Sequence, residues 1–271
     1  MTTSKSLPAL SPQAQQGGVA TRERRRVQVG PFLVDDLTSE EVVDRAVELA
    51  LDPQDRVRTL YALHVGGLNA RRDEQFVEEM NAADLVYADG GSVVVLGRMA
   101  GAGGLERSPT TDIGWDVLRR LTDRLGHAPR VAMVGGADGI AARAGEVLAS
   151  HGCGEIVFAT NGYVRDWSST VQQLAASRPD VVVVGLGAPL EMLWSRRWSH
   201  ALPPSLIMTC GGWFGFLVGH EKRAPRALRL PGLEWVARVA QSPRRLGGRY
   251  ARGLWTTAMI AGRTTVDRLS T

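Results

Sequence analysis

The chain has 271 residues, of which 44% are hydrophobic and 22% charged, so it can bury one large or two small cores. No apolar run reaches the roughly 20 residues that a transmembrane helix needs, and the N-terminal segment lacks the apolar centre of a signal peptide. Cys153 and Cys210 lie far apart and show no metal-ligand spacing, so neither a disulfide framework nor a zinc site is indicated. We therefore expect a cytoplasmic globular protein.

The net charge of +4 is unevenly distributed along the chain. Residues 219–263 carry ten lysines and arginines against two acids, whereas the other 226 residues sum to −4. A basic segment of this kind suits phosphate groups, anionic lipid headgroups or nucleic acid, unless it is only a soluble basic face.

The chain begins with residues 1–26, which are rich in Ser, Gln, Gly and Arg and predict a disordered leader. A strand is predicted over residues 27–33, and Thr38 then begins a helix with acids in its first turn. The further predicted strands are residues 59–65, 85–87, 130–136, 156–159, 180–186 and 205–209. The predicted helices between them include residues 68–82, 139–150 and 171–176, and one that begins at Asp112 or Gly114 and ends at Leu125.

Strands and helices alternate over more than 180 residues, which predicts an α/β fold with a Rossmann-like, mostly parallel sheet and helices on both faces. Four strands are followed by glycine pairs, namely Gly66-Gly67, Gly90-Gly91, Gly135-Gly136 and Gly211-Gly212. Such loops at one edge of a sheet suit a nucleotide-like ligand. The run VGGADG matches G-x-G-x-x-G only in part, and no acid ends the next strand, so a dinucleotide oxidoreductase is a weak alternative.

Asp89 directly follows a short apolar strand and precedes Gly90-Gly91. Ligands of open α/β sheets bind outside the carboxyl ends of the strands, so a carboxylate there is well placed for chemistry. Aspartate is also a favoured helix N-cap. Asp89 is therefore either a functional carboxylate or the cap of a helix that begins near Ser92.

Four segments together resemble the WecG/TagA/CpsF family of bacterial glycosyltransferases, which is glycosyltransferase family 26. They are NAADLVYADGGSVV (81–94), RVAMVGGADGIAARA (130–144), PDVVVVGLGAPLEMLW (179–194) and GHEKRAPRALRLPGLEWVARVAQSPRRLGGRY (219–250). The last segment is the most specific, and the likeness covers about residues 27–250. It implies a catalytic core over residues 27–218 and a basic helical C-terminal appendage over residues 219–271.

The resemblance implies an inverting transferase that moves an N-acetylhexosamine, typically N-acetylmannosamine, from a UDP donor to an acceptor hydroxyl. The acceptor is expected to be lipid-linked, a polysaccharide or a natural product, and no metal or other cofactor is implied. Asp89 matches the aspartate of the family's A-D-G motif and so inherits the role of general base. Such a base takes the proton of the acceptor hydroxyl while other groups stabilise the departing diphosphate.

The sequence departs from the family pattern at several points, of which two are motifs expected to contact the donor. The family's T-x-N falls where this chain reads YALH (61–64), so His64 is a second catalytic candidate, although a structural histidine is an equally good interpretation. The family's G-x-P-K-Q-E reads GAPLEM (187–192), which loses the lysine and the glutamine. These changes predict a rebuilt sugar pocket.

Further candidates for substrate binding lie in the glycine-rich loops and the basic tail. They are Gly90, Thr110, Thr111, Asp112, Gly135, Gly136, Gly187, Pro189, Glu191, Arg238, Arg245 and Arg249. Gly135 and Gly136 are expected to let backbone approach uridine or diphosphate. A helix cap by Asp112 is favoured over ligand binding for residues 110–112. Glu191 either binds a ribose or sugar hydroxyl or is a charge at a helix start.

Ser242 and Pro243 are typical of an N-cap and a first helical residue, so one helix is predicted to end near Gln241 and another to begin at Pro243. Arg245 and Arg249 then share a helix face. The resemblance brings Arg238 to the same place, at the donor diphosphate; otherwise all three face solvent or lipid headgroups. Apolar residues between the arginines suit an interfacial segment on an anionic membrane.

Two functions follow from these observations. An active glycosyltransferase is favoured because Asp89 and the basic tail are both present. The alternative is a catalytically silent nucleotide-sugar-binding or scaffold protein on the same fold. The expected partners are a UDP-sugar, a hydroxyl acceptor, the inner face of the membrane and a second copy in a homo-oligomer, but no nucleic acid.

Overall fold

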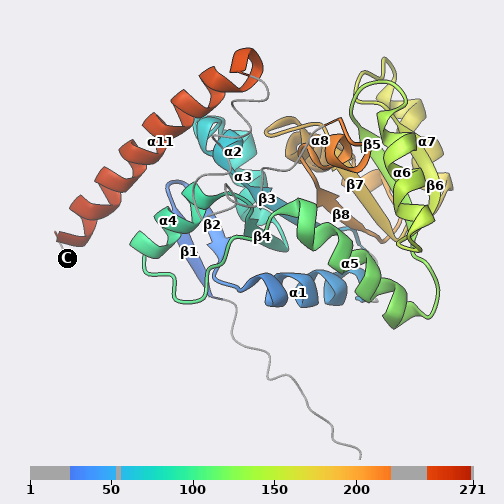
Figure 1. Cartoon of the computed structure of the whole chain (residues 1–271), viewed down its shortest axis with the longest axis horizontal. Helices are drawn as coiled ribbons and strands as arrows, with labels where there is room; N and C mark the ends of the chain where they lie inside the picture. Colours follow the sequence, from blue (N-terminus) through green and yellow to red (C-terminus); the bar gives the residue numbers. More distant parts are fainter. Residues whose placement is uncertain (1–24, 53–55, 221–242, 270–271) are drawn as a thin grey trace, which may run out of the picture.

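A six-stranded parallel sheet forms the centre of the protein, in the order β4-β3-β8-β7-β5-β6 (Figure 1). In the computed structural model the described residues are 25–52, 56–220 and 243–269. The strands are β3 (Arg58–Leu63), β4 (Leu85–Ala88), β5 (Arg130–Gly135), β6 (Glu155–Thr160), β7 (Val181–Gly185) and β8 (Leu206–Thr209). The predicted α/β class and parallel sheet are confirmed.

Helices cover both faces of this sheet. On one face lie α1 (Ser39–Leu51), α5 (Thr110–Leu125), α6 (Ile140–Ser150) and α9 (Trp213–Leu217). On the other lie α2 (Val65–Asn69), α3 (Glu74–Ala82), α4 (Gly91–Met99), α7 (Trp167–Ala176) and α8 (Leu190–Trp198), and a 3-10 turn, Ser199–Ala201, follows α8.

The valine run of β7 reflects the burial of both faces of the sheet. Val181 and Val183 belong to one apolar cluster, whereas Val182 and Val184 belong to the other. Successive side chains of a strand point to opposite faces, so a central strand with two covered faces needs apolar residues at every position. The unbroken apolar run in the sequence therefore corresponds to the middle of the sheet.

Residues 27–33 do not form the single strand that their composition predicts. β1 (Arg26–Val29) and β2 (Phe32–Asp35) are instead an antiparallel hairpin that lies apart from the main sheet. The turn falls at Gly30, whose φ of 61° is in the left-handed region that favours glycine. β1 also begins inside the predicted leader, at Arg26. This residue is opposite Asp35 in the hairpin, and its Nε lies 3.2 Å from the Oδ1 of Asp35. The rest of that leader, residues 1–24, lies outside the described residues.

The predicted helix over residues 68–82 is also two elements. α2 begins before the glycine pair, so Gly66 and Gly67 lie inside it and do not form a turn. A separate helix, α3, begins where the carboxylate of Asp73 accepts a hydrogen bond from the N–H of Phe76 at 3.1 Å. This N-cap competes with continuation of the first helix, which explains the break.

Helix α11 (Pro243–Leu269) begins at the predicted proline and lies across α2 and α4 (Figure 1). Its inner face is buried at Gly253, Thr256 and Ile260, which follow the helical spacing of three to four residues. A Cβ at Gly253 would lie 2.0 Å from the side chain of Val65, so glycine is what allows this close packing.

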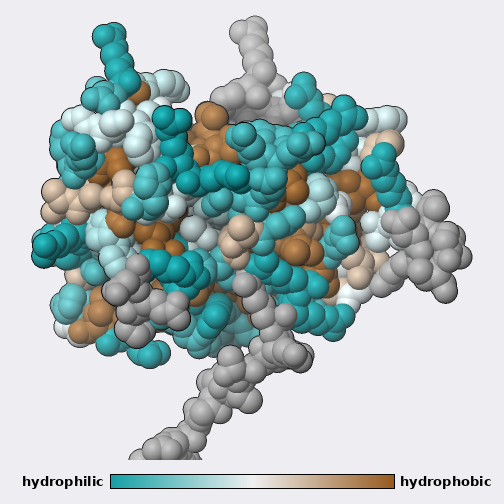
Figure 2. Space-filling model, turned by 180° about the vertical axis from the view of Figure 1, so that it is seen from behind, coloured by the Kyte–Doolittle hydropathy of each residue, from teal (hydrophilic) through white to brown (hydrophobic). Residues whose placement is uncertain are grey.

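Large apolar side chains are also exposed on the outer face of α11, at Leu254, Trp255 and Met259. Within the described part of the chain, no helix combines the length and hydropathy required to cross a bilayer. On the face of the molecule in Figure 2, apolar side chains are scattered among hydrophilic ones and do not form one continuous patch.

Candidate active site

The carboxyl ends of the parallel strands bring several predicted site residues to one edge of the sheet. His64 follows β3, Asp89 follows β4, Gly136 follows β5, Gly187 follows β7 and Gly211 follows β8. This confirms that the glycine-containing segments share an edge. The N–H of Asp89 donates to the carbonyl of Leu63 at 3.0 Å, which extends the pairing of β3 and β4 to this residue.

Asp89 is held by the first turn of α5. Its Oδ1 accepts a hydrogen bond from the backbone N–H of Thr110 at 2.8 Å. The interpretation of Asp89 as the cap of the next helix is wrong, because Gly90 is the N-cap of α4 and makes no side-chain cap bond. The carboxylate instead lies at the N-terminal end of a helix that starts 21 residues later.

Thr110 connects Asp89 to the buried Tyr87. The Thr110 hydroxyl lies 2.7 Å from the Tyr87 hydroxyl, and both side chains are buried. Burial, and then the nearby charge of Asp89, raises the pKa of Tyr87 well above its usual value, so the phenol stays protonated. The hydroxyl pair thus supports the residue that orients the carboxylate.

The expected cap by Asp112 is wrong. Helix α5 begins at Thr110 with Pro109 in the N-cap position, so Asp112 lies inside the first turn together with Thr111. The N–H of Asp112 donates to the carbonyl of Pro109 at 2.8 Å. The sequence could not show this, because the residue that binds the helix start, Asp89, comes from a distant strand.

His64 has the structural role that the sequence left open. It is the N-cap of α2, and its Nδ1 accepts a hydrogen bond from the N–H of Gly66 at 2.9 Å. A neutral imidazole that accepts at Nδ1 carries its proton on Nε2. A Cβ added to Gly211 would lie 3.9 Å from this Nε2, so the nitrogen faces the loop that follows β8. The catalytic role of His64 stays a prediction.

Glu191 ties two of the edge loops together. It lies in the first turn of α8, as expected, but its side chain is completely buried. Its Oε2 accepts hydrogen bonds from the N–H of Gly187 at 3.1 Å and from the N–H of Gly211 at 3.3 Å. Glu191 therefore fixes the loops after β7 and β8, and its contact with a ribose or sugar hydroxyl remains a prediction.

Gly135 is required by the neighbouring strand. Its φ is 128°, and a Cβ there would lie 2.4 Å from the carbonyl oxygen of Gly185 in β7. The next residue, Gly136, donates its N–H to the same carbonyl at 3.2 Å. This packing explains the glycine without a ligand, so approach of the backbone to uridine or diphosphate stays a prediction.

A cavity of about 480 Å³, here called the edge cavity, opens beside these glycines. It is lined by Gly136, Ala137, Gly162, Tyr163, Trp167, Gly185, Leu186, Leu190, Leu193, Trp194, Arg197 and Trp198. It lies beside the carboxyl ends of the neighbouring strands β5 and β7. After β5 the chain continues to β6 on one side of this pair, and after β7 it continues to β8 on the other side. Such a topological switch point is where open α/β sheets bind ligands.

Arg107 is a neighbour of Asp89 that the sequence analysis missed. Its Nε donates to the carbonyl of Asp89 at 3.3 Å, and the side chain is half-buried. The adjacent Ser108 donates its N–H to the carbonyl of Ala88 at 2.8 Å, which holds this loop along the end of β4. The one signal in the sequence was the position of Arg107 in the polar loop before residues 109–112.

The predicted arginine cluster of the tail belongs only in part to the described residues. Arg238 lies outside the described residues, and so does the predicted helix end near Gln241. Arg245 and Arg249 both lie on α11, four residues apart, but their side chains are not described. Their convergence on a donor diphosphate stays a prediction. Among the described residues, no group of three or more His, Cys, Asp or Glu side chains is placed to hold a metal ion.

The parallel sheet, the anchored Asp89 and the edge cavity place the protein in the class of open α/β folds, which bind their ligands outside the carboxyl ends of the strands. The chain belongs to the glycosyl transferase WecG/TagA/CpsF family, whose model matches residues 27–270. The family named from the four motifs is therefore confirmed, and the protein is a glycosyltransferase.

A relative in Bacillus spizizenii (strain ATCC 23059 / NRRL B-14472 / W23) is 29% identical over 196 residues. The match covers 72% of this chain and 75% of the relative, which is an N-acetylglucosaminyldiphosphoundecaprenol N-acetyl-beta-D-mannosaminyltransferase.

Proposed function

We propose that the protein is an inverting, metal-independent glycosyltransferase that transfers an N-acetylhexosamine from a UDP-sugar to a hydroxyl of a lipid-linked acceptor. The name of the Bacillus relative supports the transferred sugar and the lipid-linked acceptor, since that enzyme is named as transferring N-acetylmannosamine to N-acetylglucosaminyldiphosphoundecaprenol. The observation that carries the proposal is the position of Asp89, a half-buried carboxylate anchored through one oxygen at the carboxyl end of β4.

Asp89 acts as the general base in this reaction. The Thr110 N–H holds Oδ1, so the carboxylate has a fixed direction from which to take the proton of the acceptor hydroxyl. The acceptor oxygen attacks the anomeric carbon as the bond from that carbon to the UDP oxygen breaks, which inverts the centre. Arg107, beside Asp89, supplies a permanent positive charge for the developing charge on the diphosphate.

The donor lies along the edge of the sheet in this proposal. Asp89 follows β4, and the edge cavity lies three to four strand positions away, roughly 14 to 19 Å at the usual spacing between strands. This distance is on the scale of an extended nucleoside diphosphate sugar. The uracil would stack on Tyr163 or Trp167 in the edge cavity, and the loops fixed by Glu191 would flank the diphosphate.

The basic tail is proposed to hold the enzyme on the inner face of an anionic membrane. Leu254, Trp255 and Met259 are exposed on α11, with Arg252 and Arg263 exposed on the same helix. This mixture of apolar and basic side chains suits the interface of a bilayer. Sedimentation with anionic vesicles at low salt tests this part, and a protein that stays in the supernatant would contradict it.

Incubation of the full chain with a panel of UDP-sugars tests the enzyme directly. We expect slow release of UDP from a UDP-N-acetylhexosamine and faster release when a lipid-linked sugar acceptor is added. Release of UDP from no donor, with or without acceptor, would support the silent nucleotide-sugar-binding protein instead.

A further inference from the structure

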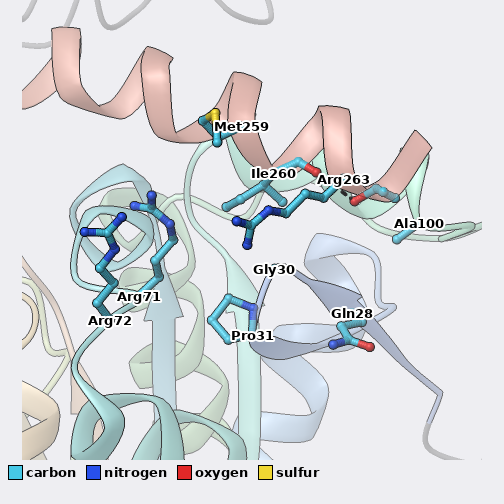
Figure 3. Close-up of a pocket in the computed structure, with 10 residues that line it drawn as sticks. Gln28, Gly30, Pro31, Arg71, Arg72, Ala100, Met259, Ile260 and Arg263 are labelled. Atoms are coloured by element: carbon cyan, nitrogen blue, oxygen red, sulfur yellow. Dashed lines mark hydrogen bonds between the residues drawn. The ribbon is translucent and has the colours of Figure 1, made fainter. Parts of the chain in front are cut away.

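A second cavity, of about 690 Å³, lies between α11, the β1–β2 turn and the C-terminal ends of α2 and α4 (Figure 3). We call it the arginine cavity. Its lining residues are Gln28, Gly30, Pro31, Arg71, Arg72, Ala100, Met259, Ile260, Arg263 and Thr264. Three of these ten residues are arginines, and none is acidic.

The three arginines approach the cavity from two parts of the chain. Arg71 and Arg72 follow α2, and Arg263 reaches toward them from α11 (Figure 3). Arg71 also donates a hydrogen bond to the Thr256 hydroxyl at 3.1 Å, which fixes its position against α11. Among the residues whose side chains the structure describes, no carboxylate forms an ion pair with any of the three.

Three arginines in one cavity suit an anion with several oxygens. Guanidinium groups stay protonated and bind phosphate oxygens through two parallel N–H donors. Three cations without a described carboxylate repel one another, and a ligand with more than one negative charge removes that repulsion. A diphosphate meets both requirements.

The cavity lies at a suitable distance from Asp89. Both α2 and α4 begin at the carboxyl edge of the sheet, where His64 and Gly90 are their N-caps, and both end at the arginine cavity. With five residues in α2 and nine in α4, these helices span roughly 8 and 14 Å. A hexose that bears a diphosphate is of similar length, so its hydroxyl can lie at Asp89 while its phosphates lie in the cavity.

An apolar surface leads away from the same cavity. Met259 lines it and is 40% exposed, and Leu254 and Trp255 follow on the outer face of α11 with 54% and 68% exposure. An extended hydrocarbon chain attached to a bound diphosphate can cover these side chains, which would otherwise remain in water.

We propose that the arginine cavity binds the diphosphate of a lipid-linked acceptor and that the lipid chain leaves along α11. This inference rests on the proposed function for the sugar end of the acceptor. The phosphate of a membrane phospholipid has related chemistry, so the experiment must separate these two sources.

Calorimetric titration of the full chain with farnesyl diphosphate tests the cavity without catalysis. We expect binding of the wild type and at least about tenfold weaker binding of the Arg72→Ala/Arg263→Ala variant, because two charge-assisted contacts are lost. The matched control is Arg124→Ala, which removes an exposed arginine of α5, away from the cavity and from α11, and should bind as the wild type does. Equal affinity of the double variant and the control would overturn the inference.

Two further ligands define the source of the phosphate. Farnesol should not bind measurably, since it lacks the diphosphate. A short-chain phosphatidylglycerol below its micelle concentration should bind much more weakly than farnesyl diphosphate. Tighter binding of phosphatidylglycerol, with the same dependence on the two arginines, would assign the cavity to membrane lipid and overturn the acceptor site.

The acceptor KM and kcat test whether the cavity binds the acceptor during the reaction. With a diphosphate-linked acceptor, the double variant should show at least about a tenfold higher acceptor KM and a smaller change in kcat. With a simple alkyl glycoside of the same sugar, which lacks the diphosphate, its KM should match that of the wild type. Equal effects on both acceptors would contradict the site. Absence of UDP release by the wild type would instead refute the proposed function, while the titration would still decide the cavity.

Discussion

The carboxylate of Asp89 and the backbone N–H of Thr110 lie 2.8 Å apart, which joins the end of β4 to the start of α5. The Thr110 hydroxyl in turn lies 2.7 Å from the hydroxyl of Tyr87. A strand end, a helix start and a buried phenol are thus combined in one hydrogen-bonded group. The direction of the Asp89 side chain depends on this group.

Thr110→Val tests the support of Asp89. Valine keeps the backbone N–H but leaves the buried Tyr87 hydroxyl without its partner, which should lower the free energy of unfolding by about 1–3 kcal/mol. Turnover should fall several-fold because the carboxylate is less firmly oriented. Thr110→Ser keeps the hydroxyl and should behave almost as the wild type in urea unfolding and in the UDP-release assay. Equal stability of the two variants would show that the hydroxyl pair contributes little.

His64→Asn separates the two roles of the histidine. Asparagine is a good N-cap, so it should keep the stability of α2 within about 0.5 kcal/mol of the wild type, whereas His64→Ala should cost about 1 kcal/mol. The asparagine variant loses the Nε2–H that faces Gly211, and its donor KM should therefore rise. If His64→Asn has normal stability and normal kinetics, His64 is only a helix cap.

The ionisation of Asp84 should make the free energy of unfolding depend on pH. Burial opposes the ionisation of Asp84, but hydrogen bonds from Arg56 and from the N–H of Thr59 outweigh burial and lower the pKa of Asp84 below its usual value. The lowered pKa means that the stabilisation is present above the usual aspartate pKa and is lost as the pH falls through the folded-state value.

Asp84→Asn should therefore lower the free energy of unfolding by about 1–3 kcal/mol at pH 7, and by less as the pH falls below about 4. Chemical unfolding at several pH values measures this difference. Asp44→Asn is the control, because Asp44 pairs with Arg120 at an exposed position, where an ion pair contributes about 1 kcal/mol or less. A difference for Asp84→Asn that does not change with pH would refute the assignment.

The sequence predicts the architecture well because the main sheet depends on simple patterns. The four consecutive valines of β7 indicate a strand buried on both faces, and the Thr38 cap correctly marks the start of α1. The errors occur where a local break competes with a continuous pattern. Gly30 divides one apolar run into β1 and β2, and the Asp73 cap divides one helical run into α2 and α3.

The site is less predictable because its contacts join distant segments. The position of Asp89 at a strand end follows from the sequence, but its bond to Thr110 requires the path of the intervening loop. The same loop brings Arg107 to Asp89. Burial of Glu191 between two loops is likewise a tertiary effect, since an acid at a helix start is usually exposed.

Turnover of Asp89→Asn is the most direct test of the general-base assignment. Asparagine keeps an oxygen that can accept the Thr110 N–H, so the fold and the donor affinity should stay within a few-fold of the wild type. It cannot take a proton, so we expect turnover to fall by about 10²-fold or more in the UDP-release assay with acceptor. Near-normal turnover of a folded Asp89→Asn variant would contradict the account.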